Sequence, residues 1–148
     1  KNPDVAQSVI DMLPFYLSEG KTEGVRGDLA FAQSCLETGN FGFFGSAVTL
    51  EQSNFCGMGV TSNGMRGNSF ATPQLGIRAQ VQHLKCYAST DKLNGDRVDP
   101  RWGEWLRGKA PYVEWLSIPN NPYGTGWAGS ATYAEVIKGI MENINKYN

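Results

Sequence analysis

Apolar residues recur at helical spacing in several parts of the chain, and the first run lies near the N-terminus. Asn2 can cap a helix that has Pro3 at its first position. Pro14 lacks the N–H that would bond to the carbonyl four residues back, so we expect it to kink or interrupt this helix. The apolar face of the predicted helix consists of Val5, Val9, Leu13 and Leu17.

A second run, from Leu29 to Cys35, is apolar on most sides and predicts a buried helix. Gly39 is a natural C-terminal stop for this helix, which places Glu37 in its last turn. The negative end of the helix dipole and the loss of water both disfavour a charged carboxylate, so we expect the pKa of Glu37 to be raised. The rings available to exclude water are Phe41, Phe43 and Phe44.

The rest of the pattern predicts a mainly α fold with one irregular insert. The stretch from Phe41 to Phe70 is rich in glycine, asparagine and serine, and Asn63-Gly64 favours a hairpin turn, so a small irregular or β-hairpin lobe is expected. Thr72-Pro73 begins another helix, and Thr132 with Glu135 forms a capping box for the last one. Short helices are predicted at 99–106 and 111–116, and the two longer apolar faces are Ile77, Val81, Leu84 and Ala88, then Tyr133, Val136, Ile137, Ile140, Met141 and Ile144.

Length and composition indicate one domain, spanning residues 1–148. The chain has 18 glycines, 7 prolines and a net charge of −1 with 18% charged residues. This balance gives no sign of nucleic-acid binding or of attraction to an anionic membrane surface. The sequence begins at Lys1 and shows no apolar stretch long enough for membrane insertion, and we expect no signal peptide in it. We therefore expect a mature product or an excised domain that is monomeric.

The cysteines and the histidine point away from metal and cofactor chemistry. Cys35, Cys56 and Cys86 are odd in number and widely spaced, so they match neither a zinc pattern nor a disulfide framework, and we expect unpaired thiols. His83 is the only histidine, and we expect it to pack within a helix with one ring nitrogen hydrogen-bonded. The sequence therefore predicts no metal site and no cofactor.

A carboxylic acid that stays protonated near neutral pH can give a proton to a leaving group, and Glu37 is the candidate for that chemistry. A helix-end glutamate that faces solvent is the alternative. Aromatic residues in polar, loop-rich stretches favour a sugar substrate, because aromatic rings stack on the apolar faces of sugars, although the same rings could simply pack under loops. These residues are Trp102, Trp105, Tyr112, Trp115, Tyr123 and Trp127.

Four segments, in order along the chain, resemble the bacterial glucosaminidase domains of glycoside hydrolase family 73. Gly24 to Gly39 resembles the hallmark segment of that family. Asn54-Phe-Cys-Gly57 is similar to the Asn-x-Phe-Gly segment, with Cys56 where the family usually has phenylalanine. Gly76 to Leu84 is similar to the helix that follows, and Gly126 to Ala134 resembles the C-terminal motif Tyr-Ala-Thr-Asp-Pro-x-Tyr.

The resemblance implies a mainly α (α+β), lysozyme-like fold in which a helical lobe and the smaller lobe flank a substrate cleft. It also implies an endo-β-N-acetylglucosaminidase that cuts peptidoglycan glycan strands at the β-1,4 bond after N-acetylglucosamine. Glu37 matches the general acid of the family, and Tyr133 matches the tyrosine that lines the cleft opposite it. Trp127 stands at the motif's first tyrosine and keeps a stacking role. The other substrate-binding residues expected are Asn54, Phe55, Thr61 and Asn63.

The chain departs from some family members in lacking a second carboxylate between Gly57 and Pro73. Glu51, Asp99 and Glu104 lie in other loops, where an exposed charge or a cap is the simpler interpretation. We therefore expect one essential carboxylate, with the 2-acetamido group of the substrate acting as nucleophile. Water activated by hydroxyl or amide groups in the same stretch is the alternative.

These observations predict a peptidoglycan hydrolase that is secreted or associated with the cell wall. Two alternatives stay open. A lytic transglycosylase shares the single glutamate but forms a 1,6-anhydro sugar instead of adding water. A non-catalytic cell-wall glycan-binding domain would have kept the cleft and lost the chemistry.

Overall fold

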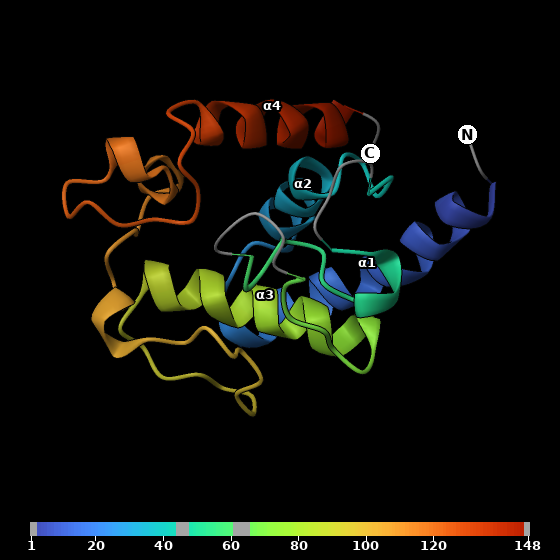
Figure 1. The fold of residues 1–148 in the computed structure, drawn as a ribbon, viewed down its shortest axis with the longest axis horizontal. Coiled ribbons are helices and arrows are strands. Elements are labelled where there is room, and N and C mark those ends of the chain that lie inside the picture. The colour runs from blue at the N-terminus through green and yellow to red at the C-terminus, as the bar shows by residue number, and fades with distance from the viewer. Residues whose placement is uncertain (1–2, 44–47, 61–65, 147–148) are drawn as a thin grey trace.

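The computed structural model describes residues 3–43, 48–60 and 66–146, so Asn2, the predicted cap of the first helix, lies outside the described residues. The described chain forms four α-helices connected by loops and short 3₁₀-helices (Figure 1). The fold is mainly α and lysozyme-like, as the sequence predicts. The α-helices are α1 (Pro3–Glu23), α2 (Gly27–Glu37), α3 (Pro73–Ala88) and α4 (Tyr133–Lys146).

Helix α2 lies at the centre of the fold and contacts each of the other three helices. In Figure 1 it is seen between α4 above and α3 below. Ala30, Ala32, Gln33 and Ser34 of α2 are buried, so small or polar side chains fill the middle of the molecule. Small side chains let neighbouring helices approach closely, but the buried polar ones require hydrogen-bond partners.

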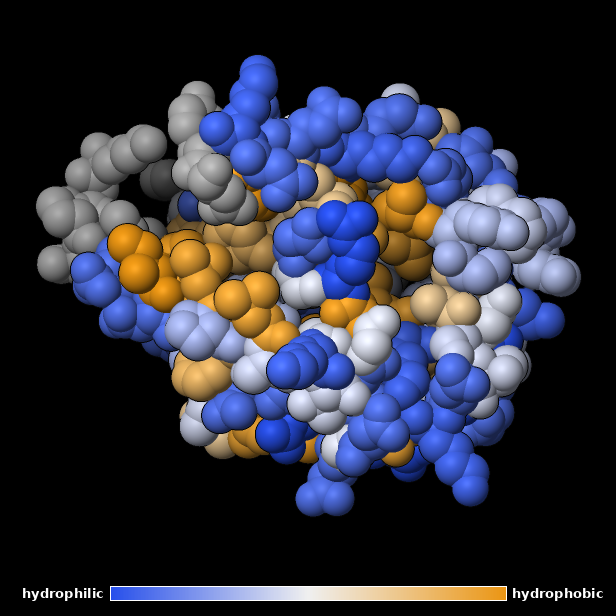
Figure 2. Space-filling view, turned by 180° about the vertical axis from the view of Figure 1, so that it is seen from behind, coloured by the Kyte–Doolittle hydropathy of each residue, from blue (hydrophilic) through white to orange (hydrophobic). Residues whose placement is uncertain are grey.

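Helix α4 covers α2 with one face and presents the other to solvent. Tyr133, Ala134 and Ile137 are buried, whereas Val136 is 41% exposed. Seen from behind in Figure 2, hydrophilic residues follow the top edge, where α4 lies in Figure 1, and apolar residues show in the hollow below. The helical period predicted for this segment is therefore present, with Val136 at the edge of the apolar stripe.

Helix α1 can be compared with its prediction at two points. Pro14 does not interrupt the helix, which continues from Pro3 to Glu23, and the alternative of a kink stays a prediction. Pro14 and Ile10, whose carbonyl loses its helical partner, are both exposed, so water can satisfy that carbonyl. Leu17 is 66% exposed, which contradicts its place on the predicted apolar face, and the buried side of α1 is built on Met12 and Tyr16.

The segment between α2 and α3 is irregular where it is described. Residues 48–60 and 66–70 contain one 3₁₀-helix, Leu50–Gln52, and no β-strand, so the predicted hairpin is not found in them. The turn predicted at Asn63-Gly64 lies outside the described residues. Backbone hydrogen bonds from Asn68 to Met58 and from Phe70 to Gln52, at 2.9 and 2.8 Å, hold the segment together. A side-chain amide adds to them, since Gln52 Nε2 donates to the carbonyl of Arg66 at 2.8 Å.

Close backbone contact at Gly76 holds this irregular segment against α3. A Cβ at Gly76 would lie only 1.7 Å from the carbonyl oxygen of Ser53, so no other residue permits the approach. As predicted, the Thr72 side chain caps α3 by accepting a hydrogen bond from the N–H of Leu75. The loop that begins at Ser53 is therefore fixed in position relative to α3.

The connection from α3 to α4 is built from turns and 3₁₀-helices. Isolated parallel bridge contacts join Ser117 to Ala128. Asn121 Nδ2 donates to the carbonyls of Lys109 and Trp115, both at 2.9 Å, so one buried amide organises this loop. The 3₁₀-helices, which replace the two short helices predicted here, are Glu104–Leu106, Val113–Leu116 and Ile118–Asn120.

A buried ion pair joins the end of α1 to α3. Glu23 and Lys85 are 2.9 Å apart, and their side chains are only 1% and 7% exposed. Burial alone would raise the pKa of Glu23, but hydrogen bonds from the N–H groups of Asn94 and Gly95 and from Lys85 outweigh it and lower that pKa. These contacts hold the end of α1, at Glu23, against α3 and against the loop at Asn94 and Gly95.

We predict that Glu23→Gln destabilises the fold by about 3–5 kcal/mol at neutral pH, because it leaves Lys85 as an uncompensated buried charge. The lowered pKa means that this stabilisation is present above the pKa of unfolded glutamate, about 4.3, and is lost as pH falls through the folded pKa. The difference from wild type should therefore shrink in acid, which urea unfolding at several pH values measures.

The matched control is Glu114→Gln, which removes an ion pair whose side chains are 46% and 47% exposed. Exposed pairs contribute little, so this variant should stay close to wild type. A Glu23→Gln protein as stable as wild type at neutral pH would contradict the role of the buried pair.

Candidate active site

Packing of α4 on α2 brings Glu37, the last residue of α2, against Tyr133, the first residue of α4. The Tyr133 hydroxyl donates a hydrogen bond of 2.8 Å to Glu37 Oε1, although the two residues are 96 positions apart in the sequence. Tyr133 is only 4% exposed, whereas Glu37 is half-buried and keeps some accessible surface. The predicted acid and the predicted cleft tyrosine are therefore in direct contact.

The environment of Glu37 disfavours its charged form. Burial raises the pKa of Glu37 above the ordinary glutamate value, and the hydrogen bond from Tyr133 offsets part of that rise. The direction agrees with the sequence prediction. Phe41 points into the core and stacks on Phe31 with ring centroids 5.7 Å apart. Phe44 lies outside the described residues.

The backbone of Gly57 lies beside the second oxygen of the Glu37 carboxyl group. A Cβ at Gly57 would be 3.7 Å from Glu37 Oε2, and the φ of +65° at this position favours glycine. The preceding residue, Cys56, is buried, and burial together with the charge of Glu37 raises the pKa of its thiol. The loop after Ser53 therefore forms a wall next to Glu37.

Asn54 and Phe55 support this loop from inside. Asn54 is fully buried, and its Nδ2 donates to the carbonyls of Met58 and Asn68 while its Oδ1 accepts from the Met58 N–H. Phe55 is 1% exposed and packs against Phe41. Their burial corrects the prediction that these two side chains bind substrate, because neither has surface to offer and the Asn54 amide is occupied within the loop.

Two buried glutamines stand behind Tyr133, and the sequence reasoning missed both. Gln33 Nε2 donates to the Tyr133 hydroxyl at 2.9 Å, and Gln80 Nε2 donates to Gln33 Oε1 at 3.0 Å. Both side chains have zero exposure. The available signal was a glutamine within the apolar run from Leu29 to Cys35, since a polar side chain in a buried helix must have partners.

Trp127 is half-buried and packs against His83, with ring centroids 4.9 Å apart. His83 Nδ1 lies 2.7 Å from Asp99 Oδ2, so the histidine is packed with one ring nitrogen hydrogen-bonded, as predicted. Trp127 also lies near Tyr87, at 6.1 Å between centroids. The indole is therefore held on one side by protein, and its half-exposed state leaves sugar stacking as a prediction.

The other carboxylates considered from the sequence are engaged or exposed. Asp99 is 4% exposed, and it accepts a hydrogen bond from the Arg101 N–H besides its contact with His83. Glu104 is exposed and accepts from Trp102 Nε1, and Glu51 is exposed on the 3₁₀-helix after Thr49. The two remaining predicted binding residues, Thr61 and Asn63, lie outside the described residues.

The described ranges contain no group of three histidine, cysteine or acidic side chains that could hold a metal ion. Cys35, Cys56 and Cys86 are unpaired, as predicted. Burial raises the pKa of the Cys35 thiol to about 11, so it is a neutral side chain at physiological pH. The titratable group that the arrangement presents for chemistry is therefore the Glu37 carboxyl.

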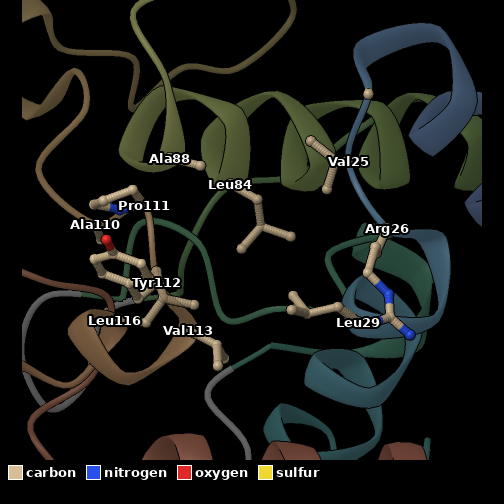
Figure 3. Close-up of a pocket in the computed structure, with 11 residues that line it drawn as sticks. Val25, Arg26, Leu29, Leu84, Ala88, Ala110, Pro111, Tyr112, Val113 and Leu116 are labelled. Atoms are coloured by element: carbon tan, nitrogen blue, oxygen red, sulfur yellow. The ribbon is translucent and has the colours of Figure 1, made fainter.

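A separate apolar pocket lies near the opposite end of α2 (Figure 3). Val25, Leu29 and Leu84 line it, and Val113 and Leu116 close one side. Leu29 and Glu37 are separated by about 12 Å of helix rise, so this pocket is not part of the Glu37 site. In the part of the chain that is described, no helix has the length and apolar character needed to cross a bilayer.

Comparison with known proteins places the chain among glycosidases. The family model "Glucosaminidase: Mannosyl-glycoprotein endo-beta-N-acetylglucosaminidase" matches residues 13–146. An uncharacterized protein of Borreliella burgdorferi is 38% identical over 149 residues, a match that covers 99% of this chain and 69% of that protein. No solved structure matches.

We predict that Glu37→Gln becomes more stable relative to wild type as pH rises. The raised pKa of Glu37 means that wild type loses stability as pH rises from the unfolded pKa, about 4.3, through the folded pKa. Glutamine cannot ionise, and its oxygen can still accept from Tyr133. Calorimetry across this range should show that the melting temperature of the variant, relative to that of wild type, increases as pH rises.

Glu51→Gln removes an exposed carboxylate and should show no such trend. A melting-temperature difference between Glu37→Gln and wild type that stays constant with pH would contradict the raised pKa of Glu37.

Proposed function

The chain belongs to the glucosaminidase family, and we propose that it is an endo-β-N-acetylglucosaminidase that cuts the β-1,4 bond after N-acetylglucosamine in peptidoglycan. The observation that carries the proposal is the half-buried carboxyl of Glu37, held by the Tyr133 hydroxyl at 2.8 Å. A carboxyl group with a raised pKa is the group that glycosidases use to protonate a leaving oxygen.

In the proposed first step, protonated Glu37 gives its proton to the glycosidic oxygen. The carbonyl oxygen of the 2-acetamido group forms a bond to C1 of the sugar as the bond from C1 to the leaving oxygen breaks. The electron pair of that bond stays on the leaving oxygen, which takes the Glu37 proton. The products are a cyclic oxazolinium ion, the released sugar chain and the Glu37 carboxylate.

In the second step, a water molecule attacks C1 and opens the ring. The Glu37 carboxylate takes a proton from this water, which restores the acid, and the acetamido group is regenerated. Two displacements on the same carbon retain the β configuration. This route needs no second protein carboxylate. That suits the absence of acidic residues from Gly57 to Pro73 in the sequence and the hydrogen bonds that engage Asp99 with His83 and Glu104 with Trp102.

Tyr133 and Trp127 have distinct proposed roles. Tyr133 contacts the carboxyl group and orients it, so we propose that it acts on the acid itself. Trp127 has one side held by His83, and its remaining surface could stack on a sugar ring. We propose that the domain acts as a monomer on glycan strands, in a secreted or cell-wall-associated setting.

We predict that Glu37→Gln lowers turnover of purified peptidoglycan by at least ~100-fold, the usual scale of general acid catalysis. Glutamine keeps the size of the side chain but has no transferable proton. The matched control is Glu51→Gln, which should remain within about tenfold of wild type. A Glu37→Gln protein that retained more than about a tenth of wild-type cleavage would remove Glu37 from the acid role.

We also predict the chemical nature of the new chain ends. Digestion should leave reducing N-acetylglucosamine ends, which mass spectrometry detects after borohydride reduction, and NMR of the fresh product should show the β-anomer. Anhydro-muramic ends would instead assign a lytic transglycosylase, and glycan binding without new ends would assign a binding domain. The α-anomer would reject substrate assistance in favour of inversion with a carboxylate base.

A further inference from the structure

A chain of buried hydrogen bonds runs through all four helices and ends on Glu37. It begins at Tyr16 of α1, whose hydroxyl donates to Ser34 Oγ of α2 at 2.8 Å. Ser34 Oγ donates to Gln80 Oε1 of α3 at 3.0 Å. The remaining links pass from Gln80 through Gln33 and Tyr133 to Glu37, at 3.0, 2.9 and 2.8 Å.

The backbone of α2 fixes the direction of this chain at Gln80. The carbonyl oxygen of Ala30 can only accept a hydrogen bond, and Gln80 Nε2 donates to it at 2.9 Å. Turning the Gln80 amide over would set its oxygen against that carbonyl. Gln80 therefore presents its NH₂ group to Ala30 and to Gln33 Oε1, and its own oxygen to the Ser34 hydroxyl.

The orientation of Gln80 determines the orientation of every later link. Because Gln33 turns its oxygen to Gln80, its NH₂ group faces Tyr133, and an NH₂ group can only donate. The Tyr133 oxygen accepts that bond, and its single hydrogen points to Glu37 Oε1. Among the described residues, Glu37 Oε1 is the acceptor that this hydroxyl reaches.

In a neutral carboxyl group the carbonyl oxygen is a much stronger acceptor than the hydroxyl oxygen, so the hydrogen bond from Tyr133 favours Oε1 as the carbonyl oxygen. The proton of the acid therefore belongs on Oε2, the oxygen next to Gly57. We propose that Gln33 and Gln80 are positioning residues for the general acid, which lock the Tyr133 hydroxyl as a donor to Oε1 and so confine the catalytic proton to Oε2. This inference rests on the proposed acid role of Glu37.

Neighbouring charge does not compete with this arrangement in the described residues. The titratable groups that interact with Glu37 are Tyr133 from α4 and Cys56 from the loop after Ser53. Burial raises the pKa of both, so each is neutral at physiological pH. The hydrogen-bond order, rather than a nearby ion, distinguishes the two oxygens of Glu37.

The test is a double-mutant comparison of Gln80→Met and Tyr133→Phe. Without the Gln80 amide, Gln33 can turn its oxygen to Tyr133, whose hydrogen then leaves Glu37. Loss of that donor raises the Glu37 pKa further, so the alkaline limb of the pH–activity profile should move to higher pH, as it should in Tyr133→Phe. In the Tyr133→Phe background, Gln80→Met should cause no additional movement.

Gln82→Met provides a matched control. Gln82 is equally buried on the same helix, but its amide bonds to the 96–99 loop, through the carbonyl of Asp96 and the N–H of Val98. This variant should leave the alkaline limb in place, whatever its effect on stability. The proposal would be overturned if Gln82→Met moved the alkaline limb as far as Gln80→Met does. It would also be overturned if Gln80→Met still moved the limb in the Tyr133→Phe background.

A second variant and a second readout keep the test independent of folding losses and of turnover. Gln33→Met removes the amide that faces Tyr133 and should move the limb in the same direction by less, because the hydroxyl can still donate. Carbon-13 NMR titration of the Glu37 carboxyl should show a higher pKa in Gln33→Met than in wild type, and a still higher pKa in Gln80→Met. If wild type cleaved no glycan, the proposed function would fail, but the NMR titration of Glu37 would still decide the positioning role. An unchanged Glu37 pKa in both Gln80→Met and Gln33→Met would reject that role.

Discussion

The hydrogen bond from Tyr133 to Glu37 is the contact on which the arrangement of the molecule depends. It forms where the end of α2 meets the start of α4, so the chemistry and the helix packing share one point. A polar pair this deeply placed is costly unless both partners are satisfied. The protein meets that requirement with the Gln33 amide of α2, which donates to Tyr133 and is itself held by Gln80 of α3. The acid therefore stands at the end of a helix, half-buried at the edge of the core.

That requirement explains the composition of the central helix. Gln33 and Ser34 occupy interior positions of α2 that leucine or alanine would otherwise fill, and Gln80 of α3 forms hydrogen bonds with both. A buried polar chain that is only partly satisfied is worse than an apolar core, so its members must act together. The close contact of Gly76 with Ser53 fixes the loop after Ser53, and this loop places Gly57 beside Glu37.

Local patterns allowed much of this to be predicted from the sequence. Helical period predicted α2, α3 and α4, the Thr72 cap marked the start of α3, and the place of Glu37 at a helix end indicated its raised pKa. The failures came from tertiary context. Solvent around Pro14 let α1 continue, and burial of Asn54 turned an expected ligand-binding amide into a support for its loop. The partners of Gln33 and Gln80 lie 100 and 47 positions away, which no local pattern reveals.

Neutron diffraction from a deuterated crystal of the wild-type protein at a pH below the Glu37 pKa tests the account most directly, because it locates the exchangeable hydrogens. The account predicts deuterium on the Tyr133 hydroxyl pointing to Glu37 Oε1, deuterium of the Gln33 amide pointing to the Tyr133 oxygen, and the acid deuterium on Oε2. Deuterium bound to Oε1 and directed at Tyr133, or a Gln33 amide with its oxygen facing Tyr133, would contradict it.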